Sequence, residues 1–192
     1  MKKIFALVAV AIVCMSASAQ TQFGFKVGFD MTNFWGENVE HGMKPSYQFG
    51  VLMEHHFTDK LAISPEVVFA SQGGKFDDIT YNTNYINVPV MLKYYVSPNF
   101  SIDFGPQLGV NVYSKLSADG IDDALDLKDA TKDIDFGLGL GGTYNLTENA
   151  FVQARYTMGL TKAFGELKLG ELGTYESDAK NGNIQIAFGM KF

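Results

Sequence analysis

Apolar and polar residues alternate one by one along much of this chain, with the two-residue period of β-strands that have one apolar face. The clearest run extends from Phe100 to Tyr113. Its apolar face carries Phe100, Ile102, Phe104, Pro106, Leu108, Val110 and Val112, and its other face carries Ser101, Asp103, Gly105, Gln107, Gly109 and Asn111. The same period recurs over 133–143 and 183–192. Helical periodicity is weak everywhere, and 119–132 is better interpreted as a loop.

This period predicts eight strands, at 22–31, 46–57, 61–72, 85–96, 100–113, 133–144, 150–160 and 183–192. Each is as long as, or slightly longer than, the roughly 9 to 11 tilted residues that cross a bilayer. The connections alternate between short turns at 58–60, 97–99 and 145–148 and long segments at 32–45, 73–84, 114–132 and 161–182. Short turns at one end and long loops at the other are typical of outer-membrane barrels. We therefore predict an all-β fold, an eight-stranded antiparallel up-and-down transmembrane β-barrel.

The first residues have the features of a secretory signal peptide. Lys2 and Lys3 precede an apolar stretch at 4–13, and Ala-Ser-Ala at 17–19 suits cleavage between Ala19 and Gln20. We expect residues 1–19 to be removed and residues 20–192 to form the barrel. The single cysteine, Cys14, lies in the removed segment and follows Val13, which argues against a lipoprotein. Disulfides and cysteine-ligated metals are then excluded from the mature chain.

Composition agrees with a folded membrane barrel. Hydrophobic residues make up 46% of the 192 residues and charged residues only 19%, with 16 Phe, 9 Tyr and 20 Gly, which excludes a disordered chain. The formal net charge is −6, and it becomes −8 once Lys2 and Lys3 are removed. Because no basic run could neutralise phosphates, we expect no nucleic-acid partner.

The polar face of the strands favours a membrane barrel over a soluble lipocalin-like barrel, whose apolar face would line a ligand cavity. A water-facing surface usually carries many Lys and Glu, whereas this face carries mainly Gly, Ser, Asn, Gln and Ala. Small residues suit a narrow interior, so we expect these glycines to point inward: Gly105, Gly109, Gly137, Gly139, Gly141, Gly159 and Gly189. Two aromatic girdles are predicted, one from Phe57, Phe100, Tyr144, Phe151 and Phe192 and one from Trp35, Tyr47, Phe69 and Tyr113.

Ionisable residues of both signs fall on the predicted inward face. The candidate lumen charges, structural or pore-lining, are Lys26, Glu54, Glu66, Lys93, Asp103, Asp135, Arg155 and Lys191, and Asp30 and Asp133 share their face. Isolated charges in a closed lumen would be costly, so we expect them to pair across the barrel. They form either a polar plug, which eight strands favour, or an ion path. Pro65, Pro89 and Pro106 lie inside strands, where we predict bulges or kinks because proline cannot donate to a ladder.

Several segments resemble the small outer-membrane β-barrel family of PorT-like, "porin family" proteins of OmpA or OmpX type. They are Gly24–Asp30 with Asn33–Phe34, Tyr85–Tyr94, Phe104–Gly109, Tyr144–Leu146, Val152–Leu160 and the terminal Phe192. The resemblance spans nearly all of 20–192, and the segment around Pro89 is its most specific part. It implies a location in a Gram-negative outer membrane, and a final aromatic such as Phe192 resembles the signal read by the barrel-assembly machinery. Some relatives serve a protein-secretion system.

Sequence motifs for chemistry are weak. His55 and His56 fall at the turn end of a strand, and no spacing ties His41 to a serine, so we expect no catalytic residues and no enzymatic activity. Residues 137–142 match G-x-G-x-x-G only inside a strand, without the helix that a dinucleotide site needs. The acidic loop 119–133 lacks the residue order of a calcium loop, and whether it binds divalent cations stays open. No cofactor or metal is expected.

The sequence thus favours a monomeric outer-membrane barrel with a structural or loop-mediated interaction role. Its expected partners are outer-membrane lipid, the assembly machinery at Phe192 and a protein at the outer loops. The fourth loop carries more apolar residues than a solvated loop needs, namely Phe164, Leu167, Leu169, Leu172 and Tyr175. Two alternatives remain, a narrow channel for ions or small solutes and an accessory barrel of a secretion system.

Overall fold

A computed structural model describes residues 20–35, 43–76, 79–118, 125–126, 134–162, 167–168, 174–175 and 180–192. Eight long strands dominate it: β1 (Thr21–Trp35), β2 (Lys44–Thr58), β3 (Leu61–Phe76), β4 (Ile79–Ser97), β5 (Phe100–Ala118), β7 (Ile134–Asn145), β8 (Ala150–Lys162) and β11 (Lys180–Lys191). Three two-residue strands lie between them: β6 (Leu125–Asp126), β9 (Leu167–Lys168) and β10 (Thr174–Tyr175). The prediction of eight long strands is confirmed. The signal segment, His41 and Asp133 lie outside the described residues.

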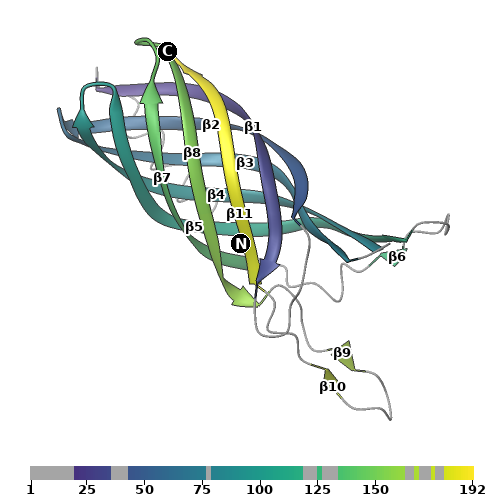
Figure 1. Ribbon diagram of the computed structural model, residues 1–192. Coiled ribbons are helices and arrows are strands. Elements are labelled where there is room, and N and C mark those ends of the chain that lie inside the picture. The colour runs from purple at the N-terminus through teal and green to yellow at the C-terminus, as the bar shows by residue number, and fades with distance from the viewer. Residues whose placement is uncertain are drawn as a thin grey trace.

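Each long strand pairs antiparallel with its neighbour in the chain, and β1 pairs with β11 to close the barrel (Figure 1). Short turns join β2 to β3, β4 to β5 and β7 to β8 at one end, which we call the turn end. Both ends of the barrel chain meet there, because Phe192 and Phe23 exchange backbone hydrogen bonds of 2.8 and 3.2 Å. The opposite end is called the loop end. Among the described residues, no helix has the length and hydropathy needed to span a membrane.

Burial alternates along the strands as the period predicted, with polar side chains inside and apolar side chains outside. On β11, Ile186 is 65% exposed, whereas its neighbour Gln185 is 4% exposed and faces the lumen. Tyr47, Phe57, Phe100, Tyr113 and Tyr144 are exposed on the outer wall, as expected for girdle residues. Phe151 is the exception, because it is buried on the inward face of β8, where its ring packs beneath the Lys191 ammonium. Its assignment to the girdle was wrong.

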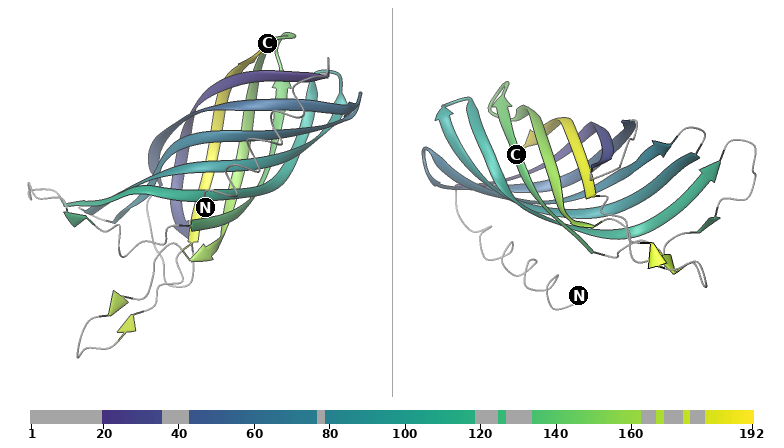
Figure 2. Two further views of the ribbon diagram at one scale, coloured as in Figure 1. Left: turned by 180° about the vertical axis from the view of Figure 1, so that it is seen from behind. Right: turned by 60° about the horizontal axis from the view of Figure 1, so that its bottom comes forward.

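Several strands are longer than their periodicity indicated, and three of them extend the sheet at the loop end. The predicted loop at 73–84 is mostly strand, since β3 continues to Phe76 and β4 begins at Ile79, and β5 continues to Ala118. The extended parts pair with one another and project from one side of the loop end (Figures 1 and 2). We call the part formed by 71–76, 79–84 and 111–118 the projecting sheet. The loops at 114–132 and 161–182 likewise contain the short strands β6, β9 and β10.

The three strand prolines produce neither bulges nor register shifts, so the prediction of bulges at these positions was wrong. Instead, the ladders keep their register and skip pairs beside each proline. The β2–β3 ladder passes from Leu52–Glu66 to His55–Ile63, and so has no pair at Pro65. The β3–β4 ladder has no pair at Pro89, and the β4–β5 ladder has none at Pro106. A missing amide donor is therefore accommodated by local gaps in the ladder.

A polar lumen as the candidate functional site

Near the turn end, four donors surround one buried carboxylate. Glu54 of β2 accepts hydrogen bonds from Lys93 Nζ at 2.6 Å, Lys191 Nζ at 3.0 Å and the Tyr95 hydroxyl at 2.5 Å. Its Oε1 also lies 2.9 Å from Nε2 of His56. These residues come from β2, β4 and β11, so this cluster ties separate parts of the wall together across the lumen. We call it the Glu54 cluster.

A second carboxylate, Glu66 of β3, lies between two cations nearer the middle of the barrel. Lys26 Nζ of β1 donates to its Oε2 at 2.6 Å, and Arg155 of β8 donates to both oxygens at 3.0 and 2.7 Å. Lys26 also donates to Oε1 of Gln153 at 3.0 Å. The paired donation by Arg155 is the strongest geometry available to a guanidinium and a carboxylate. This Glu66 cluster bridges the interior from β3 to β8.

Asp103 of β5 is held by neutral donors instead of a direct cation. The Ser101 and Thr143 hydroxyls donate to it at 2.6 and 2.5 Å, and Gln153 Nε2 lies at 3.4 Å. Because Gln153 also accepts from Lys26, it joins Asp103 to the Glu66 cluster. A continuous network of polar contacts therefore crosses the half of the lumen nearer the turn end.

The half of the lumen nearer the loop end is organised differently. Asp135 accepts from the Thr161 hydroxyl at 2.5 Å and from Asn181 Nδ2 at 2.8 Å. Asp30 accepts from two neutral amides, Asn183 Nδ2 at 3.5 Å and the side chain of Gln48. Five buried oxygens here have no hydrogen-bond partner in the protein: Asp30 Oδ1, Ser46 Oγ, Thr83 Oγ1, Thr157 Oγ1 and Asn183 Oδ1. Buried oxygens of this kind are normally satisfied by ordered water, so we expect this half to be hydrated.

Charges of opposite sign lie close together within the lumen. Each glutamate is bonded to two cations, and the excess positive charge is offset by Asp103, which lies near Lys93 and Arg155, and by Asp30, which lies near Arg155. Buried ion pairs of this kind add little net stability, but breaking one leaves an uncompensated charge and is costly. The arrangement therefore links strands on separate parts of the wall through bonded side chains inside the lumen.

The structure places the eight predicted lumen residues in these clusters. Seven of them are buried, namely Lys26, Glu54, Glu66, Lys93, Asp103, Arg155 and Lys191, and Asp135 is partly exposed towards the loop end. The sequence did not identify the neutral hydrogen-bond partners of these charges, which are Tyr95, Ser101, Thr143 and Gln153. Their position on the inward face was the only signal in the sequence, and many other polar residues share it. Within the described ranges, no group of three or more His, Cys, Asp or Glu could hold a metal ion.

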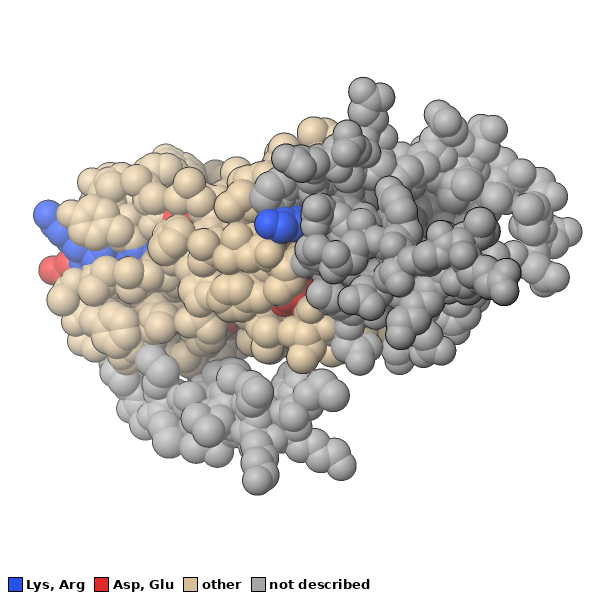
Figure 3. Space-filling model, turned by 90° about the horizontal axis from the view of Figure 1, so that it is seen from below, with Lys and Arg blue, Asp and Glu red and all other residues tan. Residues whose placement is uncertain are grey.

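The outer wall shows few charges. Exposed apolar side chains cover the membrane-facing surface of the strands, and Figure 3 shows a described wall composed mostly of uncharged residues, with Lys and Arg at one end and beside the undescribed part. An apolar band around a polar interior is the reverse of a soluble barrel and is the arrangement that lipid requires.

Comparisons with known proteins agree with this geometry. A family model described as outer membrane protein beta-barrel domain matches residues 16–165. The chain is similar to the crystal structure of Ail of Yersinia pestis, with a TM-score of 0.56, 14% identity and coverage of 90% of this chain and 99% of that one. It is also similar to Neisserial surface protein A, with a TM-score of 0.58, 12% identity and coverage of 91% and 98%. No curated protein matches its sequence. This chain therefore belongs to the outer membrane protein β-barrel family, and its place is the cell outer membrane.

Proposed function

We propose that this protein is a monomeric membrane anchor with an obstructed lumen that presents its outer loops and its projecting sheet to a protein partner, without enzymatic activity. The projecting sheet is the observation that carries this proposal. Its strands β4 and β5 have 19 residues each, against 12 in β7 and in β11. The sheet therefore continues at the loop end well beyond the part of the wall formed by β7 and β11.

The edges of the projecting sheet have few ladder partners within the described part of the chain. The β2–β3 ladder ends at Gln48–Ala70, so the ladder partner of residues 71–76 of β3 is β4, and Lys44 Nζ donates to the backbone oxygen of Gln72 at 3.2 Å. On the other side, the β5–β7 ladder ends at Val110–Ile134, and beyond it only Lys115 and Leu116 pair with β6. Edge strands present backbone donors and acceptors to which an extended segment of another protein can add as a strand. We infer that this sheet binds its partner in that way.

The lumen also supports this proposal, because bonded side chains from separate strands cross it. The Glu54 and Glu66 clusters and Asp103 fill the half near the turn end with bonded side chains from opposite walls. An eight-stranded barrel leaves room only for side chains to interdigitate. A channel would need several of these contacts to break together.

Photo-crosslinking in cells tests the interaction role. A photoreactive amino acid replaces Lys75 in the projecting sheet or, as a matched control, Lys60 in the turn between β2 and β3. We expect one defined crosslinked product from position 75 and none from position 60. A second variant has a two-residue turn in place of 73–82, and its photoreactive amino acid is placed elsewhere at the loop end. This variant should fold as a barrel but should no longer crosslink to the partner. The absence of any product at position 75, or equal products at both positions, would contradict the proposal.

A further inference from the structure

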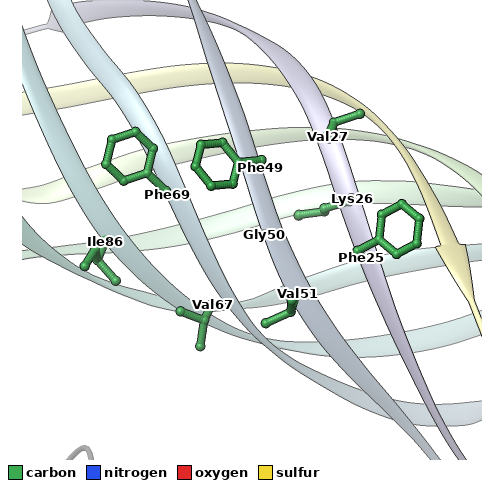
Figure 4. Close-up of a pocket in the computed structure, with 9 residues that line it drawn as sticks. All are labelled: Phe25, Lys26, Val27, Phe49, Gly50, Val51, Val67, Phe69 and Ile86. Atoms are coloured by element: carbon green, nitrogen blue, oxygen red, sulfur yellow. The ribbon is translucent and has the colours of Figure 1, made fainter.

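Two adjoining apolar hollows lie on the outer wall of β1, β2 and β3, and together we call them the β1–β3 groove. The first encloses about 510 Å³, and its side chains encircle Gly50, with the rings of Phe25, Phe49 and Phe69 on three separate strands (Figure 4). The second encloses about 360 Å³ and includes Met53 and Phe192. Val51 and Val67 line both hollows, so the groove is continuous.

Local sequence explains why the wall is hollowed there. Short valines at 51 and 67 lie among long aromatic side chains, which leaves a depression between the rings. The second hollow adjoins Pro65, where the β2–β3 ladder skips its pairs. Met53 is only 2% exposed, although Phe49 and Val51 on the same face of β2 are 51% and 59% exposed. Met53 is therefore covered by its neighbours in the part of the groove near the turn end.

The chemistry of the groove excludes a polar occupant. Lys26 and Glu66 contribute to its lining, yet their side chains turn into the lumen, where they bond to each other at 2.6 Å and are almost completely buried. What remains facing outward is hydrocarbon and aromatic ring. Five consecutive residues of β2, from Phe49 to Met53, follow the groove, which gives a length of about 16 Å at 3.3 Å per residue.

We propose that the β1–β3 groove binds one acyl chain of a phospholipid in the periplasmic leaflet of the outer membrane. Lipid is the solvent around this wall, since the groove is continuous with the exposed apolar band of a membrane barrel. The leaflet follows from position, because the groove runs from the middle of the wall to Phe192 at the turn end, which carries the short periplasmic turns. A narrow, elongated hollow fits a single flexible chain better than the convex wall of a second barrel.

A photoactivatable lipid tests this proposal directly. The folded protein is placed in vesicles that contain a phosphatidylethanolamine with a diazirine in one acyl chain, and the labelled peptides are mapped after irradiation. We expect peptides that contain 47–53 and 65–69 to be labelled at least threefold more than peptides from the lipid-facing parts of β7 and β8. Excess unlabelled phosphatidylethanolamine should reduce this preference.

Two matched substitutions separate a specific site from general lipid contact. Val51→Phe fills the groove and should reduce labelling of β2 and β3 at least threefold, whereas Val152→Phe, on the lipid-facing side of β8, should leave it unchanged. Both keep an apolar residue on the outer wall, and a heat-dependent gel shift shows that each variant is folded. Uniform labelling around the barrel, or labelling that Val51→Phe does not change, would overturn the proposal. So would efficient disulfide dimers of Val51→Cys in vesicles, which would show that a second copy covers the groove.

Discussion

The inward glycines differ in how much space a side chain would have at each position. Gly105 and Gly139, which pair with each other across β5 and β7, allow this difference to be tested. A Cβ added at Gly105 would collide with the backbone oxygen of Val90, which cannot move without disturbing β4. A Cβ at Gly139 would meet only the ends of the Met91 and Arg155 side chains, at 3.2 and 3.4 Å, and these can shift. We expect Gly105→Ala to lower the free energy of unfolding by about 1–3 kcal/mol.

The matched control is Gly139→Ala, for which we expect a smaller loss, below about 1 kcal/mol. Urea unfolding in detergent micelles or vesicles measures both variants. Equal losses for the two substitutions would show that the close approach of β4 and β5 is not what requires glycine at position 105.

Glu54 is the residue on which the lumen network depends most. Glu54→Gln keeps the shape of the side chain but leaves Lys93 and Lys191 without their shared counter-charge. We expect Glu54→Gln to cost about 3 kcal/mol or more of unfolding free energy, because it leaves two buried ammonium groups without a counter-charge.

Asp30→Asn is the control for Glu54→Gln, since it removes an equally buried charge that accepts from the neutral amides of Asn183 and Gln48. We expect its effect on the unfolding free energy to stay within about 1 kcal/mol. If both substitutions cost the same, the Glu54 cluster would not be the contact that holds the wall together.

Alternation was enough to place the charged residues inside, because a two-residue period sends Lys26, Glu66 and Arg155 to one face. Their partners could not be predicted, because contacts across a closed barrel depend on strand tilt and on the shear of the register. Phe151 is a different case, because alternation itself places it on the same inward face as Arg155, and its assignment to the girdle followed the usual place of aromatic residues instead.

At the scale of whole strands, the period identified every membrane-crossing segment but misjudged where β3, β4 and β5 end. The segment 73–84 was predicted to be a loop because it contains Gly73, Gly74, Asn82 and Asn84, residue types that are common in loops. Beyond the membrane, a strand has no apolar face to mark it, so periodicity is lost while backbone pairing continues. The pairing is visible only once the register is known.

The ladder gaps beside Pro65, Pro89 and Pro106 predict a local difference in backbone protection. Amide hydrogen exchange in micelles should be faster at Met53, whose amide faces the gap at Pro65, than at Phe25–Asp30, where the β1–β2 and β1–β11 ladders are continuous. Equal protection in the two segments would mean that the skipped pairs are hydrogen-bonded in solution.

At the scale of the molecule, one sequence produces a barrel that is apolar outside, polar inside and extended at one end. The lumen network and the projecting sheet lie at different heights, so the network can hold the wall while the sheet remains free to bind. Function should then depend on the loop end and not on transport through the barrel.

Planar-bilayer conductance of the purified protein tests that account most directly, with the gel shift on heating as evidence that the inserted barrel is folded. We predict no steady current for the folded wild type, because the Glu54 and Glu66 clusters obstruct the lumen. A stable, salt-dependent current that changes its ion selectivity with Lys93, Asp103 or Arg155 substitutions would contradict the account and show that these residues line a pore.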